Sequence, residues 1–133
     1  RLPISPNVIK ADAAELVLTP DNGLFHAAID GTGYMSIEQH SWLSWTVESD
    51  SDAEYDIFVI YDPQNDAKEY AVRCGGDEVK QVLPGVDRMV QTGYMGSLKI
   101  SKGVSEVVFD QERRSEPLEP LGLDLKRLIL RRK

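Results

Sequence analysis

The sequence predicts an all-β protein, a jelly-roll β-sandwich of about eight to nine antiparallel strands. Seven prolines and ten glycines divide the 133-residue chain into short pieces. Several of these pieces alternate between apolar and polar residues with a period of two, which is the mark of a half-buried strand. The strands recur at even spacing and are separated by turn residues, an arrangement typical of sandwiches and jelly rolls.

The first part of the chain contains two short expected strands. Ala14, Leu16 and Leu18 form an alternating apolar set. The segment Thr19–Gly23 follows with a strong turn signal, because Pro, Asp, Asn and Gly are the residues that turns prefer. A second strand is expected over Leu24–Ile29.

Two longer segments are expected to build the core. In the first, Leu43, Trp45 and Val47 fall on one face, which we expect to be buried. Trp42 opens this strand on the opposite face. The second segment, Tyr55–Tyr61, is apolar on both faces in its middle, so we expect a central strand that is covered on both sides.

The second half of the chain continues with strands and tight turns. Gly75-Gly76 predicts a hairpin between Glu69–Cys74 and Glu78–Leu83, because glycine tolerates the positive φ of such turns. Cys74 lies in an apolar alternation and is expected to be an inert, buried small hydrophobe. Further strands are expected around Leu98 and Ile100, over Val104–Asp110 and over Leu123–Leu130, with loops at Pro84–Thr92 and Gln111–Gly122.

Composition limits the function classes. Length and a hydrophobic share of 41% suit a single domain over residues 1–133 with one core. Fifteen basic and twenty-two acidic side chains give a net charge of −7, which argues against nucleic acid, since phosphate binding needs a basic surface. The cations of the last strand are interpreted as a solvated sheet edge that discourages pairing between sheets; they are Lys126, Arg127, Arg131, Arg132 and Lys133.

One cysteine allows no internal disulfide and no cysteine-based zinc site. Small secreted animal domains tend to be rich in disulfides, so a bacterial origin fits better. The sequence has no apolar run long enough to span a bilayer, and we expect no membrane partner. Because the chain begins at Arg1 and not at a methionine, we expect a fragment or processed product of a longer protein.

The order of the core and turn motifs resembles a known family. The motifs are Gly33-Tyr34-Met35, Trp42–Trp45, Tyr55–Ile57, Gly96–Gly103 and Leu125–Leu130. This order is similar to that of galactose-binding-like jelly rolls. They include carbohydrate-binding modules of families 6 and 35, and the C-terminal accessory domains of bacterial α-L-fucosidases and related glycosidases or sulfatases.

Two positions depart from the pattern of the fucosidase-appended group. Met35 stands where that group usually has an aromatic residue, and the acidic run Glu48–Glu54 replaces a Pro-x-x-Gly turn. The resemblance covers about Ala11–Leu130. It implies a non-catalytic accessory domain of a larger carbohydrate-active enzyme, secreted to an extracellular or periplasmic location, with the catalytic domain of the parent chain as a partner.

The resemblance also implies a carbohydrate site among the loops at one end of the sandwich. Sugar binding needs an aromatic ring for the C–H face and polar groups for the hydroxyls. Three segments offer them: Gly31–Ser41, Pro84–Thr92 and Gln111–Gly122. The candidate ligand-binding residues are Tyr34, His40, Trp42, Asp87, Arg88 and Arg113.

Each candidate also has a structural interpretation. Trp42 can pack under a loop or against a neighbouring domain, Tyr34 can be structural, and His40 can be an ordinary surface residue. The pair Arg113-Arg114 can grip an anionic sugar through forked hydrogen bonds, or it can simply be solvated.

We expect no cofactor, with one exception that the resemblance suggests. Modules of families 6 and 35 often carry a structural calcium ion near the chain ends. Hard cations bind several carboxylate and carbonyl oxygens. Asp12, Glu15 and Asp124 are the acidic residues near the two ends that supply such ligands.

The alternative function is a purely structural or protein-interaction β-sandwich domain without a sugar ligand. Trp42 separates the two: exposure near the loops favours sugar binding, and burial or a flat patch away from them favours docking. An enzyme is not expected, because neither His26 nor His40 lies in a recognisable catalytic motif.

Overall fold

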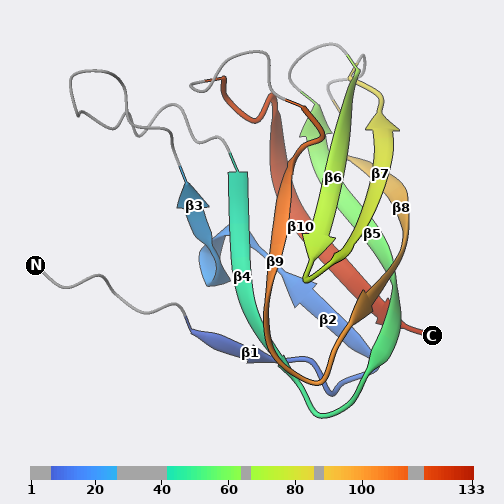
Figure 1. Ribbon diagram of the computed structural model, residues 1–133. Coiled ribbons are helices and arrows are strands. Elements are labelled where there is room, and N and C mark those ends of the chain that lie inside the picture. The colour runs from blue at the N-terminus through green and yellow to red at the C-terminus, as the bar shows by residue number, and fades with distance from the viewer. Residues whose placement is uncertain (1–6, 27–41, 64–66, 86–88, 114–118) are drawn as a thin grey trace, which may run out of the picture.

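The computed structural model describes residues 7–26, 42–63, 67–85, 89–113 and 119–133 (Figure 1). These residues form ten strands and one short 3-10 helix, η1 (Pro20–Asn22). The strands are β1 (Val8–Lys10), β2 (Glu15–Leu18), β3 (Leu24–His26), β4 (Trp42–Ser49), β5 (Ala53–Pro63), β6 (Lys68–Cys74), β7 (Asp77–Leu83), β8 (Gln91–Ile100), β9 (Gly103–Gln111) and β10 (Leu123–Arg132).

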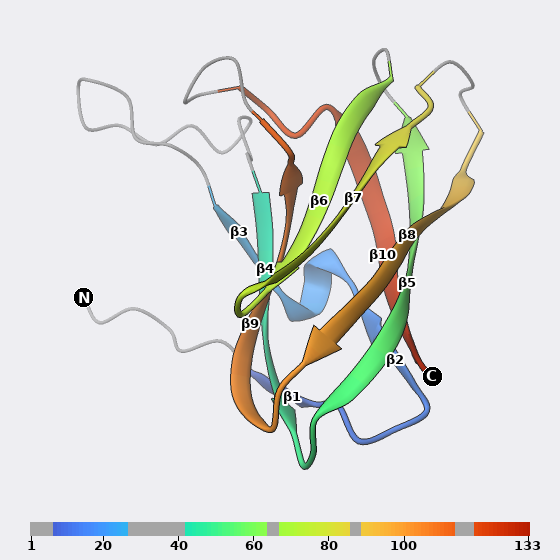
Figure 2. The same ribbon diagram turned by 45° about the vertical axis from the view of Figure 1, so that its right-hand side comes forward.

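The strands form two sheets that face each other (Figures 1 and 2). The six-stranded sheet has the order β1-β4-β9-β6-β7, with β3 also paired to β4, and the four-stranded sheet has the order β2-β10-β5-β8. All pairs are antiparallel except β1 with β4. The predicted all-β jelly-roll sandwich is therefore confirmed, with one strand more than expected, the three-residue β1. No helix in the described part of the chain is long and apolar enough to cross a membrane.

The core lies between the sheets and follows the predicted alternation. Leu43, Trp45 and Val47 are 0% exposed, which confirms the phase assigned to β4. In β5, the inward side chains from Tyr55 to Tyr61 are also buried. The sequence-based expectation that β5 is covered on both faces is wrong for its outward face, where Phe58 and Ile60 are only half-buried.

The predicted hairpin between β6 and β7 is confirmed. Cys74 pairs with Asp77 across the turn, and Gly75 has a φ of 59°. This left-handed conformation is open to glycine at low cost, which explains its place in the turn. Cys74 is buried, as its apolar surroundings predicted.

The interpretation of the last strand as a sheet edge is wrong. β10 pairs with β2 on one side and with β5 on the other, so it lies inside the four-stranded sheet. Its cations, and Lys133 after it, are nevertheless exposed. Arg131 forms an ion pair of 3.2 Å with Glu15, and Lys133 one of 3.3 Å with Glu54.

Candidate functional site

Strand pairing brings together the strand ends that flank the three candidate loops. We call this end of the sandwich the loop end (top of Figure 1). The strands β4, β6, β8 and β10 begin there, and β5, β7 and β9 end there. The registers that fix this alignment are Leu43 with Phe109, Lys68 with Leu83, Tyr61 with Gln91, and Leu123 with Pro63.

Two of the six candidate ligand residues lie within the described chain. Trp42 is the first residue of β4 and is half-buried. Arg113 follows β9 at the loop end and is exposed. The other four candidates lie outside the described residues; they are Tyr34, His40, Asp87 and Arg88.

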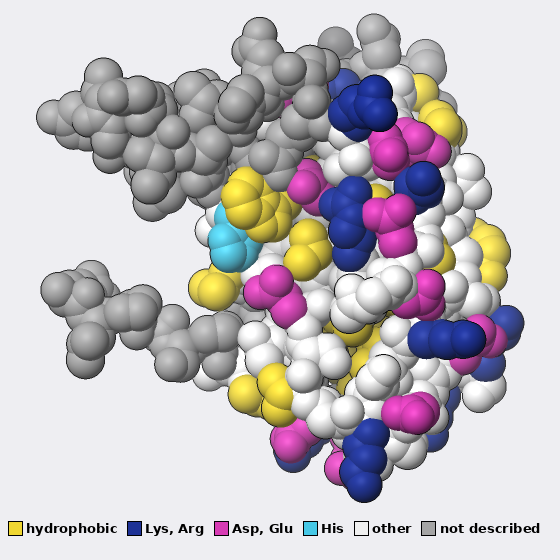
Figure 3. All heavy atoms as spheres, in the orientation of Figure 1, with side chains coloured by type: hydrophobic (Ala, Val, Ile, Leu, Met, Phe, Trp, Pro, Cys, Tyr) yellow, Lys and Arg dark blue, Asp and Glu magenta, His cyan; other side chains and the backbone are white. Residues whose placement is uncertain are grey.

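The Trp42 ring lies against a histidine on the outward face of the six-stranded sheet. His26 is its direct partner across the β3–β4 pair. The two rings are stacked, with centroids 5.0 Å apart and an angle of 6° between their planes. His26 is held in turn by Ser44, whose Oγ lies 2.7 Å from His26 Nε2. Figure 3 shows the histidine beside hydrophobic side chains on this face, with acidic and basic groups over the neighbouring strands.

Sequence reasoning did not find His26 as a site residue. Its contact with Trp42 depends on the register between β3 and β4, and residues 27–41 separate the two strands in the chain. A two-residue turn would have fixed that register from local sequence, but a long connection does not. The signal that was present is the alternation that puts Trp42 on the outward face.

A shallow hollow lies at the loop end between the start of β6 and the end of β9. Its lining is rich in charge and consists of Lys68, Glu69, Gln111, Glu112, Arg113 and Glu119. Lys68 Nζ lies 3.0 Å from Glu119 Oε1. The predicted candidate Arg113 thus contributes to a polar depression that contains both carboxylates and cations.

Two bonds hold the segment before β10 beside this hollow. Gln111 Nε2 donates a hydrogen bond of 2.7 Å to the Pro120 carbonyl, and the Tyr70 hydroxyl donates one of 2.8 Å to the Leu121 carbonyl. Both donors are buried. Burial is the first cause that raises the pKa of Tyr70, which keeps this hydroxyl protonated as a donor.

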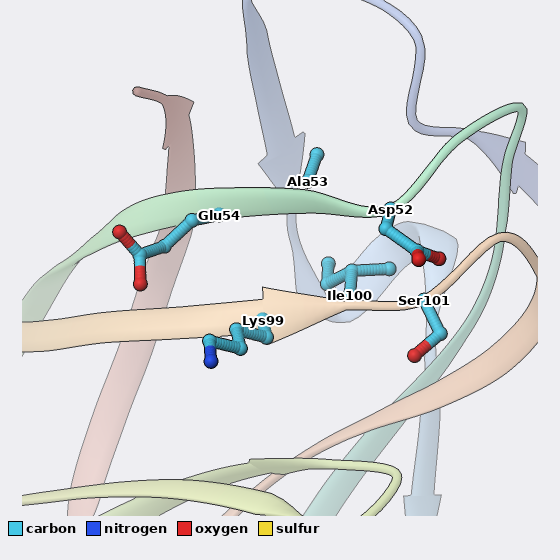
Figure 4. Close-up of a pocket in the computed structure, with 6 residues that line it drawn as sticks. All are labelled: Asp52, Ala53, Glu54, Lys99, Ile100 and Ser101. Carbon is cyan, nitrogen blue, oxygen red and sulfur yellow. The ribbon is translucent and has the colours of Figure 1, made fainter.

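A second pocket lies at the opposite end of the sandwich and contains none of the candidate residues. It is lined by Asp52, Ala53, Glu54, Lys99, Ile100 and Ser101 (Figure 4). Its carboxylates are engaged in holding the fold. Asp52 accepts a hydrogen bond of 2.8 Å from the Lys102 backbone, and Glu54 pairs with Lys133.

The three acidic residues proposed as calcium ligands do not come together. Glu15 pairs with Arg131 near the end of β10, whereas Asp124 lies near its start and contacts Lys126 at 2.8 Å. At about 3.3 Å per residue, the two ends of β10 are on the order of 20 Å apart. In the described ranges no three acidic, histidine or cysteine side chains converge on a possible metal position. A calcium ion shared by Asp12, Glu15 and Asp124 therefore does not fit this arrangement.

Comparison with known proteins identifies the fold. No family model matches the chain, and no curated protein matches it. Among solved structures, it is similar to a Podospora anserina β-(1,4)-mannanase of glycoside hydrolase family 26 that carries a family 35 carbohydrate-binding module. The TM-score is 0.67 at 12% identity, covering 90% of this chain and 28% of the mannanase. This chain thus spans little more than a quarter of that enzyme.

Two further structures match at similar levels. A family 35 carbohydrate-binding module from Clostridium thermocellum has a TM-score of 0.61 at 12% identity, with 89% of this chain and 98% of the module covered. The mosquito-larvicidal toxin Cry4Aa from Bacillus thuringiensis also has a TM-score of 0.61, at 14% identity, with 96% of this chain and 25% of the toxin covered. The chain therefore has the jelly-roll fold of family 35 carbohydrate-binding modules, as the resemblance implied.

Proposed function

We propose that residues 1–133 form a single, non-catalytic domain of a larger carbohydrate-active enzyme and bind carbohydrate at the loop end. The fold supports this proposal, because it is shared with a family 35 carbohydrate-binding module and with an enzyme that carries such a module. The same fold in a larvicidal toxin means that the fold alone does not decide the function. An extracellular or periplasmic location and a catalytic neighbour in the parent chain follow from the proposal.

The observation that carries the proposal is the ordered ring of Trp42. Ser44 is 2% exposed and fixes the His26 ring, and the His26 ring lies flat against the Trp42 ring. The orientation of the indole is therefore set before any ligand arrives. A ring that needs no reordering on binding loses little conformational entropy, which favours affinity.

The surroundings of Trp42 suit a sugar. The C–H face of a pyranose packs on an indole, and its hydroxyls need polar partners. Continuing the β4–β9 register by one residue places Trp42 across from Asp110. The charged hollow with Lys68 and Arg113 lies at the same end of the sandwich.

Ser44 and His26 contain the atoms of a nucleophile and its base, but their position argues against catalysis. Nucleophilic attack needs a hydroxyl that substrate can reach. The Ser44 hydroxyl is buried in the sheet behind the His26 ring. The pair therefore serves to position Trp42.

Tryptophan fluorescence provides a test specific to the loop end. The chain has two tryptophans, and Trp45 is 0% exposed, so a sugar-dependent change in emission reports on Trp42. We expect soluble galactomannan, xylan or mixed-linkage β-glucan to change this emission. Trp42→Ala should weaken binding of the same polysaccharide by about tenfold or more in isothermal titration calorimetry.

His26→Ala removes the support but keeps the indole, and we expect a smaller loss than for Trp42→Ala. Val104→Ala, on an exposed side chain far from the loop end, is the control and should bind like the wild type. Unchanged emission with every polysaccharide, together with wild-type affinity of Trp42→Ala, would instead favour the structural or protein-interaction function.

A further inference from the structure

The outward face of the four-stranded sheet carries an apolar row that crosses all four strands, which Figure 2 shows side by side. Val17, Ile129, Phe58 and Tyr94 are direct partners in the registers of β2, β10, β5 and β8. Val17 is 38% exposed and Tyr94 48%. Contiguous apolar side chains that remain open to solvent mark a surface that contacts another molecule.

Opposite charges lie on the two central strands of this face, beside the apolar row. Arg131 of β10 is the direct partner of Asp56 of β5. Lys133, which follows β10, forms an ion pair of 3.3 Å with Glu54 of β5. Cations therefore lie on the β10 side, and carboxylates on the β5 side, of the line between these two strands.

This distribution makes the face complementary to itself. A two-fold axis that runs between β10 and β5, along the strands, places β10 of one copy opposite β5 of a second copy. Arg131 of each copy then lies opposite Asp56 of the other, and Lys133 lies opposite Glu54. An axis across the strands, along the apolar row, would instead place Arg131 opposite Arg127, where two cations repel each other. The charges thus select the axis along the strands.

The same axis brings the apolar row onto its own copy. Ile129 lies opposite Phe58 of the other copy, and Val17 lies opposite Tyr94. The apolar row then occupies the centre of the contact, with the charged pairs along its border. An apolar centre with a polar rim is the usual composition of a protein interface.

The Asp56 carboxylate is already oriented for such a contact. The Tyr94 and Ser97 hydroxyls both donate to its Oδ1, at 2.8 Å and 2.9 Å. Among the residues that the structure describes, no hydrogen-bond donor reaches Asp56 Oδ2. This oxygen is therefore left to accept a charge-assisted hydrogen bond from an arginine of another molecule. A group that is fixed beforehand loses little entropy on association.

The size of the face fits a weak dimer. Four strands about 4.8 Å apart, each of about nine residues at about 3.3 Å, give a face of ~19 Å by ~30 Å. This is on the order of 600 Å² for each copy and ~1,200 Å² for the pair, at the lower limit of stable protein interfaces. We therefore expect a dissociation constant in the micromolar range.

We propose that this sheet face binds a second copy of the same chain, in a two-fold dimer whose axis runs between β10 and β5. The two four-stranded sheets stack face to face, as the layers of an aligned sandwich do. Because the axis follows the strands, the loop ends of both copies point in the same direction. If the loop end binds carbohydrate, the dimer offers two sites to one polysaccharide and gains avidity. This gain rests on the proposed function, whereas the dimer itself does not.

Sedimentation equilibrium of the 133-residue chain, from about 1 μM to about 1 mM, tests for the dimer. Arg131→Glu and Asp56→Lys should each raise the dissociation constant by at least about tenfold, because like charges then face each other across the axis. Tyr94→Ala should weaken the dimer by a similar factor, since it truncates an aromatic side chain of the interface. Lys102→Glu and Val104→Ala change exposed residues outside this face and are the controls.

An equimolar mixture of Arg131→Glu and Asp56→Lys tests the axis directly. In the mixed dimer, each reversed charge meets its opposite on the other variant, and the remaining natural pair is intact. We expect the mixture to associate within about threefold of the wild type, although each variant alone is weak. Circular dichroism checks that both variants fold. If Asp56→Lys does not, Lys133→Glu with Glu54→Lys repeats the exchange at the second charge pair.

The outcomes separate the dimer from the proposed function. A wild type that stays monomeric at all concentrations overturns the inference, even if it binds polysaccharide. A dimer that Arg131→Glu and Tyr94→Ala leave unchanged also overturns it, because another face then holds the copies together. A mixture of folded charge variants that associates no better than each alone overturns the proposed axis. A dimer with restored association in the mixture, but without binding of any polysaccharide, supports the inference and removes the proposed function.

Discussion

Trp45 Nε1 donates a hydrogen bond of 2.7 Å to the backbone carbonyl of Thr19. Because Trp45 lies in the six-stranded sheet and Thr19 follows β2 of the four-stranded sheet, this bond joins the two layers. Other core aromatics bind connecting segments in the same way: Tyr55 donates to Ala11 at 2.6 Å, Tyr61 to Pro84 at 2.9 Å and Tyr70 to Leu121 at 2.8 Å. Large side chains thus fill the core and satisfy loop carbonyls at once.

Trp45→Ala should lower the free energy of unfolding by about 3–5 kcal/mol, since it truncates a large side chain that is 0% exposed. Trp45→Phe keeps much of the ring but removes the indole donor, at a cost of about 1 kcal/mol, because the Thr19 carbonyl keeps the hydrogen bond of 3.2 Å that it accepts from the Asn22 N–H. Chemical denaturation measures both. Val104→Ala, at an exposed position, should stay within about 0.5 kcal/mol of the wild type. An unchanged unfolding curve for Trp45→Ala would contradict the buried position of the indole.

Gly23→Ala should destabilise the protein by about 1–3 kcal/mol through overpacking against the same indole. A methyl group on Gly23 would lie 2.7 Å from Trp45 Cδ1 and 2.8 Å from the Ser44 carbonyl oxygen. The backbone of Gly23 is extended, so the cost arises from space alone.

Gly76→Ala is the matched control for Gly23→Ala. A methyl group on Gly76 meets nothing within 4 Å, so its effect on stability should be within about 0.5 kcal/mol. Thermal or chemical unfolding of the two variants, measured in parallel, tests this difference in stability. Equal stability of both would show that the indole moves aside without cost.

Local sequence predicted where the strands lie far better than which strands pair with each other. Alternation placed Leu43, Trp45 and Val47 in the core, because burial of one face leaves a period of two in the sequence. It did not show that β10 lies inside a sheet, because strand order is a property of the whole fold. The cations of this segment therefore suggested an edge, although the strand that carries most of them is paired on both sides. The strand β1 is short and left no clear alternation.

The candidate site was predictable in position but not in detail. The phase of β4 placed Trp42 opposite the core, and the turn pattern identified the loops of one end. His26 was missed because its stacking on Trp42 follows from long-range register. The contact between the rings of Phe58 on β5 and Tyr94 on β8 was missed for a related reason. The apolar run Tyr55–Tyr61 suggested burial on both faces, whereas Phe58 lies on a half-exposed face and meets Tyr94 through a bulge.

Cys74 should react slowly with Ellman's reagent in the native protein. Burial raises the pKa of its thiol, and the nucleophile in this reaction is the thiolate. We expect the rate to rise by at least about tenfold on addition of a denaturing concentration of urea, since unfolding exposes the thiol and returns its pKa toward the usual value. Rapid labelling of the native protein, at the rate of the unfolded chain, would contradict the burial of Cys74.

The pKa of Asp56 should lie below its ordinary value of 3.8 because Tyr94, and next Ser97, donate hydrogen bonds to the carboxylate. A depressed folded pKa means that the ionised carboxylate stabilises the native state. That contribution is complete above about pH 4 and is lost as the pH falls through the lower folded value. The difference in stability between the wild type and Asp56→Asn should therefore be constant near neutral pH and shrink in acid.

A carboxyl titration followed by nuclear magnetic resonance measures the Asp56 pKa directly. Tyr94→Phe removes the larger of the two causes and should move this pKa back toward 3.8. Ser97→Ala removes the smaller cause and should move it less. If Tyr94→Phe leaves the Asp56 titration unchanged, the tyrosine hydroxyl does not hold the carboxylate.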